Sequence, residues 1–210
     1  MWLTRWNHPA KCVPYLYPAN IKDTISKARE SIFKSNSEDA TQLINNQLDK
    51  ISTGIREFPA FVATFYELWE LRALTAYLNG DLKAASDDLQ YLVEKQLQME
   101  TLYVNSRTED KDTHEDATFV LNEHIMAQSH DLGKFQLYQG LYEDAQRNFQ
   151  LSARRGHIYR NLQHVGRVSG LMGAMYDAVG NPKVAEAYHK EALKLNPFVG
   201  LYTLTCFNSP

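Results

Sequence analysis

Apolar residues recur at intervals of three and four along most of this chain, the spacing that gathers them on one side of an α-helix. The pattern is present in residues 21–34, 39–55, 81–96, 141–155 and 181–196. Each of these segments is amphipathic. The sequence therefore predicts an all-α fold.

One short pattern occurs three times: a small residue, a glycine seven places later and an alanine five places after that. The copies are Ala73, Gly80, Ala85; Gly133, Gly140, Ala145; and Gly173, Gly180, Ala185. Seven residues make about two helical turns, so the small residue and the glycine lie near one stripe of a helix that the glycine ends. The alanine then faces back from the next helix, and small residues on both sides allow a close approach. The predicted unit is a helical hairpin.

These hairpins resemble tetratricopeptide repeats (TPRs). The third copy has the signature residues Gly173, Tyr176, Gly180, Ala185, Ala192 and Pro197, and the second has Leu132, Gly133, Tyr142, Ala145 and Phe149. The first keeps Trp69, Ala73, Gly80 and Ala85, but Leu92 and Leu97 replace the later small residue and the proline. The glycines are not spaced at the regular TPR period of about 34 residues. The resemblance covers residues 60–200 and implies an irregular α-solenoid that binds proteins and has no enzymatic activity.

The remaining segments complete the predicted organisation. Residues 1–20 are an arm rich in aromatic residues and proline, which either packs over the end of the solenoid or anchors a partner. Residues 21–58 read as a degenerate leading hairpin, and residues 59–210 as three TPR-like hairpins with a terminal helix. The charged run at 105–116 is predicted to be a solvated loop. Within it, Thr113 and Asp116 have capping-box spacing and should start a long helix toward Gly140.

The composition of the 210-residue chain argues against several classes of partner and site. A formal charge of −3 gives no general attraction to nucleic acid or to anionic membranes. Cys12 and Cys206 are too few and too far apart for a disulfide scaffold or a zinc site. No apolar run is long enough for a membrane span, and the first residues lack the apolar core of a secretory signal. We expect a cytoplasmic or nuclear protein without a cofactor, whose partners are proteins or peptides.

The TPR resemblance also implies a concave groove lined by the first helix of each hairpin. The positions of the family that face the groove correspond here to Glu67, Glu70, Tyr77, His130, Lys134, Tyr138, Arg167 and Asp177. Such a groove would be acidic at one end and basic further along, and would hold a peptide or partner protein. TPR domains that bind chaperone C-termini use paired Lys and Asn residues. Only Lys134 is in a comparable place, so that function is not carried over.

A second candidate surface is basic. No acidic residue lies between Asp144 and Asp177, a stretch that contains five arginines and two histidines: Arg147, Arg154, Arg155, Arg160, Arg167, His157 and His164. The spacing of Arg160, His164 and Arg167 predicts that they share one helix face. Two interpretations stay open: a solvated face, or a dock for an acidic or phosphorylated peptide, since guanidinium groups match carboxylate and phosphate.

One string suggests catalysis. Residues 129–135, SHDLGKF, resemble the His-Asp dyad of HD-domain metal-dependent phosphohydrolases. That chemistry needs a further histidine and a distant aspartate on the same metal. His114 would lie about 24 Å away along the same helix, and His124 would point elsewhere. An HD-type phosphohydrolase using His130 and Asp131 is therefore the alternative function to a protein-binding scaffold.

The end of the chain suggests self-association. Residues 198–207, FVGLYTLTCF, are predicted to be the first helix of a further repeat that lacks its second helix. An apolar face left over in this way is covered by a longer array or by another copy. The string ALKLNPF with the aromatic segment after it resembles TPR subunits of the anaphase-promoting complex, whose N-terminal arrays form homodimers. The resemblance implies a homodimer.

Overall fold

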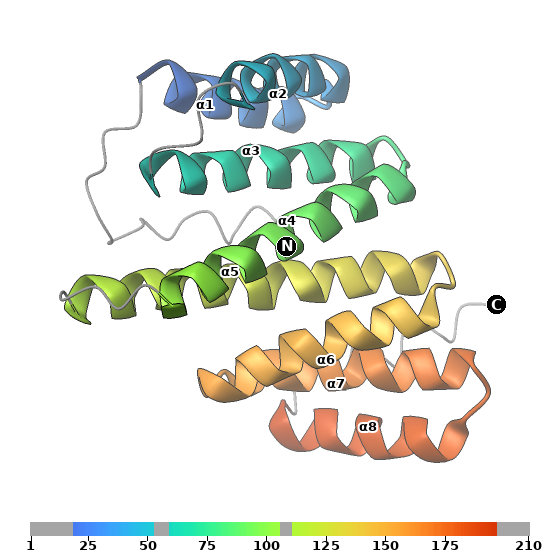
Figure 1. Ribbon diagram of the computed structural model, residues 1–210. Helices are drawn as coiled ribbons and strands as arrows, with labels where there is room; N and C mark the ends of the chain where they lie inside the picture. The colour runs from blue at the N-terminus through green and yellow to red at the C-terminus, as the bar shows by residue number, and fades with distance from the viewer. Residues whose placement is uncertain (1–18, 53–58, 106–110, 197–210) are drawn as a thin grey trace. The chain divides into compact units, whose positions relative to one another are not determined.

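The computed structural model describes residues 19–52, 59–105 and 111–196, which form eight helices (Figure 1). In chain order these are α1 (Ala19–Phe33), α2 (Ser37–Ser52), α3 (Pro59–Leu78), α4 (Leu82–Asn105), α5 (Lys111–Tyr138), α6 (Tyr142–Ile158), α7 (Leu162–Ala178) and α8 (Pro182–Leu195). No strand occurs in these three ranges. The prediction of an all-α fold built from helical hairpins is confirmed.

The chain divides into two compact units, Met1–Thr75 and Ala76–Pro210, with the boundary inside α3. In the first unit, apolar side chains from three helices form one core: Ile21, Ile25 and Ala28 of α1, Ile44 and Leu48 of α2, and Leu68 and Leu71 of α3. An ion pair between Arg29 and Glu67 joins α1 to α3 at the edge of this core. Burial raises the pKa of Glu67, and the Arg29 charge opposes that rise.

In the second unit, each of the helices from α4 to α8 packs against the next one along the chain, and α5 also contacts α7. Figure 1 shows α5, α6, α7 and α8 as successive layers that run in alternating directions. Contacts mainly between neighbouring elements are typical of repeat architectures. The central cluster contains Ala145 and Phe149 from α6 with Val168, Met172 and Met175 from α7.

Five of the connections between helices share one three-residue turn. In each, the middle residue donates its N–H to a carbonyl three residues back, and the third residue donates to a carbonyl five residues back. This is the Schellman arrangement, which satisfies carbonyls that the helix end leaves unpaired. The middle residues are Ser35, Gly80, Gly140, Arg160 and Gly180, and all five have left-handed φ between 53° and 80°. The three glycines named by the sequence pattern are confirmed as turn residues.

The third residue of each turn usually begins the next helix as well. The Oδ1 atoms of Asn36, Asp81, Asn161 and Asn181 accept the backbone N–H three residues later. Side-chain oxygens of this kind satisfy amides that have no partner at a helix N-terminus. Leu141 occupies the same place between α5 and α6 and makes no such bond. One short turn therefore ends one helix and caps the next.

Close helix contact occurs where the sequence pattern places its small residues. A Cβ atom on Gly133 would lie 2.8 Å from the Phe149 ring and 3.2 Å from the Ala145 carbonyl oxygen. On Gly173 it would lie 2.5 Å from the His189 ring. The later alanines of the pattern, Ala85, Ala145 and Ala185, are at most 1% exposed. The predicted close approach is confirmed for the α5–α6 and α7–α8 hairpins.

The predicted loop at 105–116 is wrong over its second half. Helix α5 already begins at Lys111, so Thr113 lies inside the helix and does not cap it. The charged run is predicted to be a loop because it lacks apolar periodicity. Its acidic residues are, however, also favourable near a helix N-terminus, where their charge interacts well with the helix macrodipole. The arm before Ala19 and the segment FVGLYTLTCF lie outside the described residues, and the division into arm, leading hairpin and repeats stays a prediction.

We expect Gly133→Ala to lower the free energy of unfolding by about 1 to 3 kcal/mol, because the added methyl group meets a buried ring and a backbone oxygen. Gly173→Ala should cost less, since only the partly exposed His189 ring has to move. Urea denaturation of both variants measures the difference. Equal losses would show that the α5–α6 contact is looser than described.

Arg160→Gly should raise the free energy of unfolding by about 1 kcal/mol, because glycine adopts left-handed φ without the steric cost that other residues pay. The reciprocal control is Gly180→Ala, which should lower it by a similar amount at the same position of the next turn. Thermal and urea denaturation measure both. A destabilised Arg160→Gly protein would mean that the Arg160 side chain itself stabilises the fold.

Candidate functional site

On α5, the predicted groove residues become more exposed toward the C-terminal end of the helix: His130 is largely buried, Lys134 is half-buried and Tyr138 is exposed. Tyr138 is 57% exposed, and the Lys134 Nζ lies 6.0 Å from the centre of its ring. Lys134 forms no ion pair with any residue that the structure describes. This end of α5 therefore offers a cation and an exposed aromatic ring.

The predicted groove residues from α3 are divided between the two units. Glu67 is paired with Arg29 and Glu70 is half-buried, both in the first unit. Tyr77 belongs to the second unit, where its ring stacks on Phe135 of α5 at 5.0 Å between centroids. Of these three, only Tyr77 is placed with the residues of α5.

The two predicted groove residues of α7 differ in their surroundings. Arg167 is exposed and has no carboxylate partner within the described ranges. Asp177 accepts from the Nε2 of His189 at 2.9 Å, so it is already engaged by α8. The same His189 ring covers the backbone at Gly173. Of these two residues, Arg167 is the one without a partner of opposite charge among the described residues.

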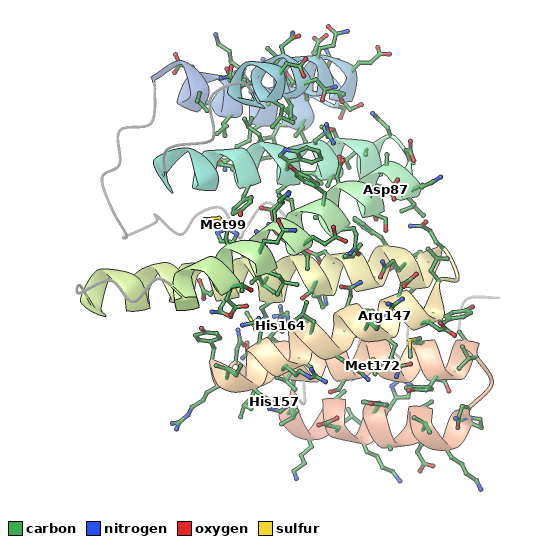
Figure 2. The ribbon with its side chains drawn as sticks, in the orientation of Figure 1. Asp87, Met99, Arg147, His157, His164 and Met172 are labelled. Carbon is green, nitrogen blue, oxygen red and sulfur yellow. The ribbon has the colours of Figure 1, made fainter. Side chains whose placement is uncertain are left out.

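The prediction that Arg160, His164 and Arg167 share one helix face is wrong. Arg160 is the left-handed middle residue of the turn before α7 and is not helical. His164 is only 4% exposed, and Figure 2 shows it among the packed helices, whereas Arg167 is exposed. The spacing predicts a continuous helix because no glycine marks this turn. No single basic stripe runs along α7.

His164 instead completes a buried polar bridge. Its Nε2 lies 2.7 Å from the Oγ of Ser152 on α6, and that Oγ lies 2.7 Å from the carbonyl oxygen of Met126 on α5. A carbonyl can only accept, so the single hydroxyl proton goes to Met126 and the histidine donates to Ser152. The bridge joins α5, α6 and α7 through three side-chain and backbone groups.

This arrangement does not activate a nucleophile. A catalytic serine donates its proton to the histidine that acts as its base, and here the histidine is the donor. Ser152 is also fully buried, so no substrate reaches it. The contact was not predicted, although Ser152 continues the buried stripe of Ala145 and Phe149 at helical spacing. A serine on that stripe signals a buried polar contact.

A second polar contact joins α6 to two helices. The guanidinium of Arg155 donates to both carboxylate oxygens of Glu100 on α4, one of them at 2.6 Å, and to the Oδ1 of Asn122 on α5. Paired donation to one carboxylate is the strong form of this interaction. One of the five arginines of the basic stretch therefore holds the fold together, a role that its position in the sequence does not reveal.

The dyad of the phosphohydrolase alternative is present as two neighbouring side chains. The Nδ1 of His130 lies 2.9 Å from the Oδ1 of Asp131, and its ring lies 5.4 Å from that of His164. Among the side chains that the structure describes, no three of His, Cys, Asp or Glu are grouped so that they could hold a metal. Two ligands from one dyad are fewer than a metal-dependent hydrolase requires.

Among the described residues, none of the helices is long and apolar enough to cross a membrane. No family model matches the sequence, and no curated protein matches it. Two similar solved structures contain nearly identical TPR-like repeats of a candidate kinesin light chain from Podosopora anserina. They are 15% and 14% identical to this chain, cover 88% and 87% of it and 98% of their own length, and have TM-scores of 0.42 and 0.41.

Removing the Ser152 hydroxyl tests the buried bridge. Ser152→Ala leaves the buried His164 N–H without its acceptor and should lower the free energy of unfolding by about 1 to 3 kcal/mol. The control is Ser129→Ala: Ser129 is equally buried, but its hydroxyl bonds only to carbonyls of its own helix. Chemical denaturation should show a much smaller loss for the control. Equal losses would mean that the bridge adds nothing beyond burial.

Proposed function

We propose that the second unit is a protein-binding module that holds an acidic segment of a partner protein along α5 and α7. The observation that carries the proposal is the presence of a cation without a carboxylate partner on each helix, Lys134 and Arg167. Helices α5 and α7 contact each other, and the ring of His130 on α5 lies 5.4 Å from that of His164 on α7. Both helices are the first members of their hairpins, the position that lines the ligand surface of TPR-like repeats.

The remaining side chains on this surface fit the same ligand. Tyr138 and Tyr77 are exposed aromatic residues, which contribute large contact areas at protein interfaces. Asp177 accepts a hydrogen bond from the His189 ring, which occupies one of its carboxylate oxygens. The ligand expected from these groups is an extended peptide with carboxylates and at least one apolar side chain.

Three features support a non-catalytic role. The hydroxyl proton of Ser152 is directed at a backbone carbonyl. His130 and Asp131 bond to each other and bring no third ligand among the described side chains. Both pairs also lie in tightly packed parts of the second unit. They are explained as polar contacts that fix the packing of helices.

The experiment is a selection of random 12-residue peptides displayed on phage against the full chain. Selected peptides should be rich in Asp and Glu, and their affinity should fall about tenfold for Lys134→Gln/Arg167→Gln, because two charge-assisted contacts are lost. Fluorescence anisotropy with the labelled peptides measures the affinities. Binding should also weaken as salt is added.

The matched control removes two charges of the same sign elsewhere in the second unit. Arg147 and Lys190 are exposed and already paired, with Asp144 and Glu186. The variant Arg147→Gln/Lys190→Gln should leave the affinities nearly unchanged. Selected peptides without acidic residues, or equal losses in both double variants, would contradict the proposed surface.

A further inference from the structure

The turn between α6 and α7 differs from the other described turns in its middle residue. Arg160 has φ 53°, whereas three of the four other turns have glycine there. A long side chain in left-handed conformation costs free energy that glycine avoids. Ser35 is the other residue of the set that is not glycine, with φ 58°, and Arg160 is the one with a long charged side chain. Strain retained at such a residue points to a use for the side chain.

Two large apolar side chains flank this arginine and lie in solvent. Ile158, the last residue of α6, is 65% exposed, and Leu162, the first residue of α7, is 50% exposed. Arg154 lies four residues before Ile158 and His157 lies one residue before it, and both are exposed in the last turns of α6. Figure 2 shows His157 in this part of the helix. Together these five residues form what we call the turn surface: Arg154, His157, Ile158, Arg160 and Leu162.

The charges of the turn surface are not balanced within it. Arg147 and Arg155 of the same helix have carboxylate partners, but Arg154 and Arg160 have none among the residues described. Two carboxylates of neighbouring helices face this region: Glu100, which is bound to Arg155, and Glu123 of α5, whose charge acts on Tyr159. Cations near a helix C-terminus interact favourably with the macrodipole. This interaction accounts for Arg155 and His157 in the last turn of α6, but not for Arg160, which lies beyond the helix end.

We propose that the turn surface is a second docking site, separate from that on α5 and α7, for an acidic amphipathic segment of a partner protein. Apolar side chains of the segment contact Ile158 and Leu162, and its carboxylates pair with the guanidinium groups of Arg154 and Arg160. Charge complementarity selects this ligand, since guanidinium forks match carboxylates. An anionic membrane is disfavoured because two apolar side chains insert too little surface for stable binding.

The test uses a fluorescein-labelled 12-residue peptide built from Glu and Leu at amphipathic helical spacing. Its binding to the full chain is followed by anisotropy, in wild type and in Lys134→Gln/Arg167→Gln, where the surface on α5 and α7 is disabled. Arg154→Gln/Arg160→Gly, made in that background, should weaken binding about tenfold. Glycine suits the backbone at 160, so this variant folds, as its circular dichroism will show.

The apolar half of the site has its own variant and control. Ile158→Ser should weaken binding, whereas Leu141→Ser, which removes an exposed leucine from the α5–α6 turn, should not. Arg147→Gln is the charge control and should also have no effect. The same peptide with Gln in place of every Glu should not bind.

Three results would overturn the proposal. The first is the absence of saturable peptide binding in the Lys134→Gln/Arg167→Gln background. If the wild-type protein binds the same peptide, this result leaves the proposed function on α5 and α7 intact. The second is an equal loss in the control variants. The third is binding to phosphatidylserine vesicles that disappears in Arg154→Gln/Arg160→Gly, which would assign the turn surface to a membrane. Peptide binding that depends on Arg154, Arg160 and Ile158 establishes it even if the phage selection fails.

Discussion

A connection of three residues is too short to separate two helices, so the second helix must turn back directly on the first. In this chain that constraint recurs at five turns, each with its middle residue in left-handed conformation and the same pair of backbone hydrogen bonds. Because the third residue of the turn usually caps the following helix, one tripeptide fixes both the end of one helix and the start of the next. The positions of the packed faces follow from where these turns fall.

Within the second unit, the turns centred on Gly140, Arg160 and Gly180 follow one another at intervals of 20 residues. Equal intervals repeat the same relation between each turn and the helix after it. The small residues Gly133 and Gly173 then meet the next helix at equivalent places. The turn spacing therefore determines which residues of α5 and α7 are used for contacts between helices.

The sequence predicts the features that depend on local chemistry. Glycines at left-handed positions, alanines at helix contacts and the all-α fold can be predicted because each residue type is strongly favoured at its place. The sequence does not reveal the turn at Arg160, because arginine is not a typical turn residue. The regular spacing through His164 instead predicts one continuous helix. Contacts between distant residues, such as Arg155 with Glu100 or Ser152 with Met126, depend on how helices pack and leave no local pattern.

The buried polar contacts decide which charges remain for binding. The net charge of the chain does not by itself identify a partner, because the chain as a whole is only slightly acidic. Arg155 pairs with Glu100 between helices, and Asp177, which stays about half exposed, accepts a hydrogen bond from His189. What remains on the surface of the second unit includes Lys134, Arg154, Arg160 and Arg167, all cations without a carboxylate partner among the described residues. Because a buried pair removes one charge of each sign from the surface, an acidic protein can still present basic surfaces to an acidic partner.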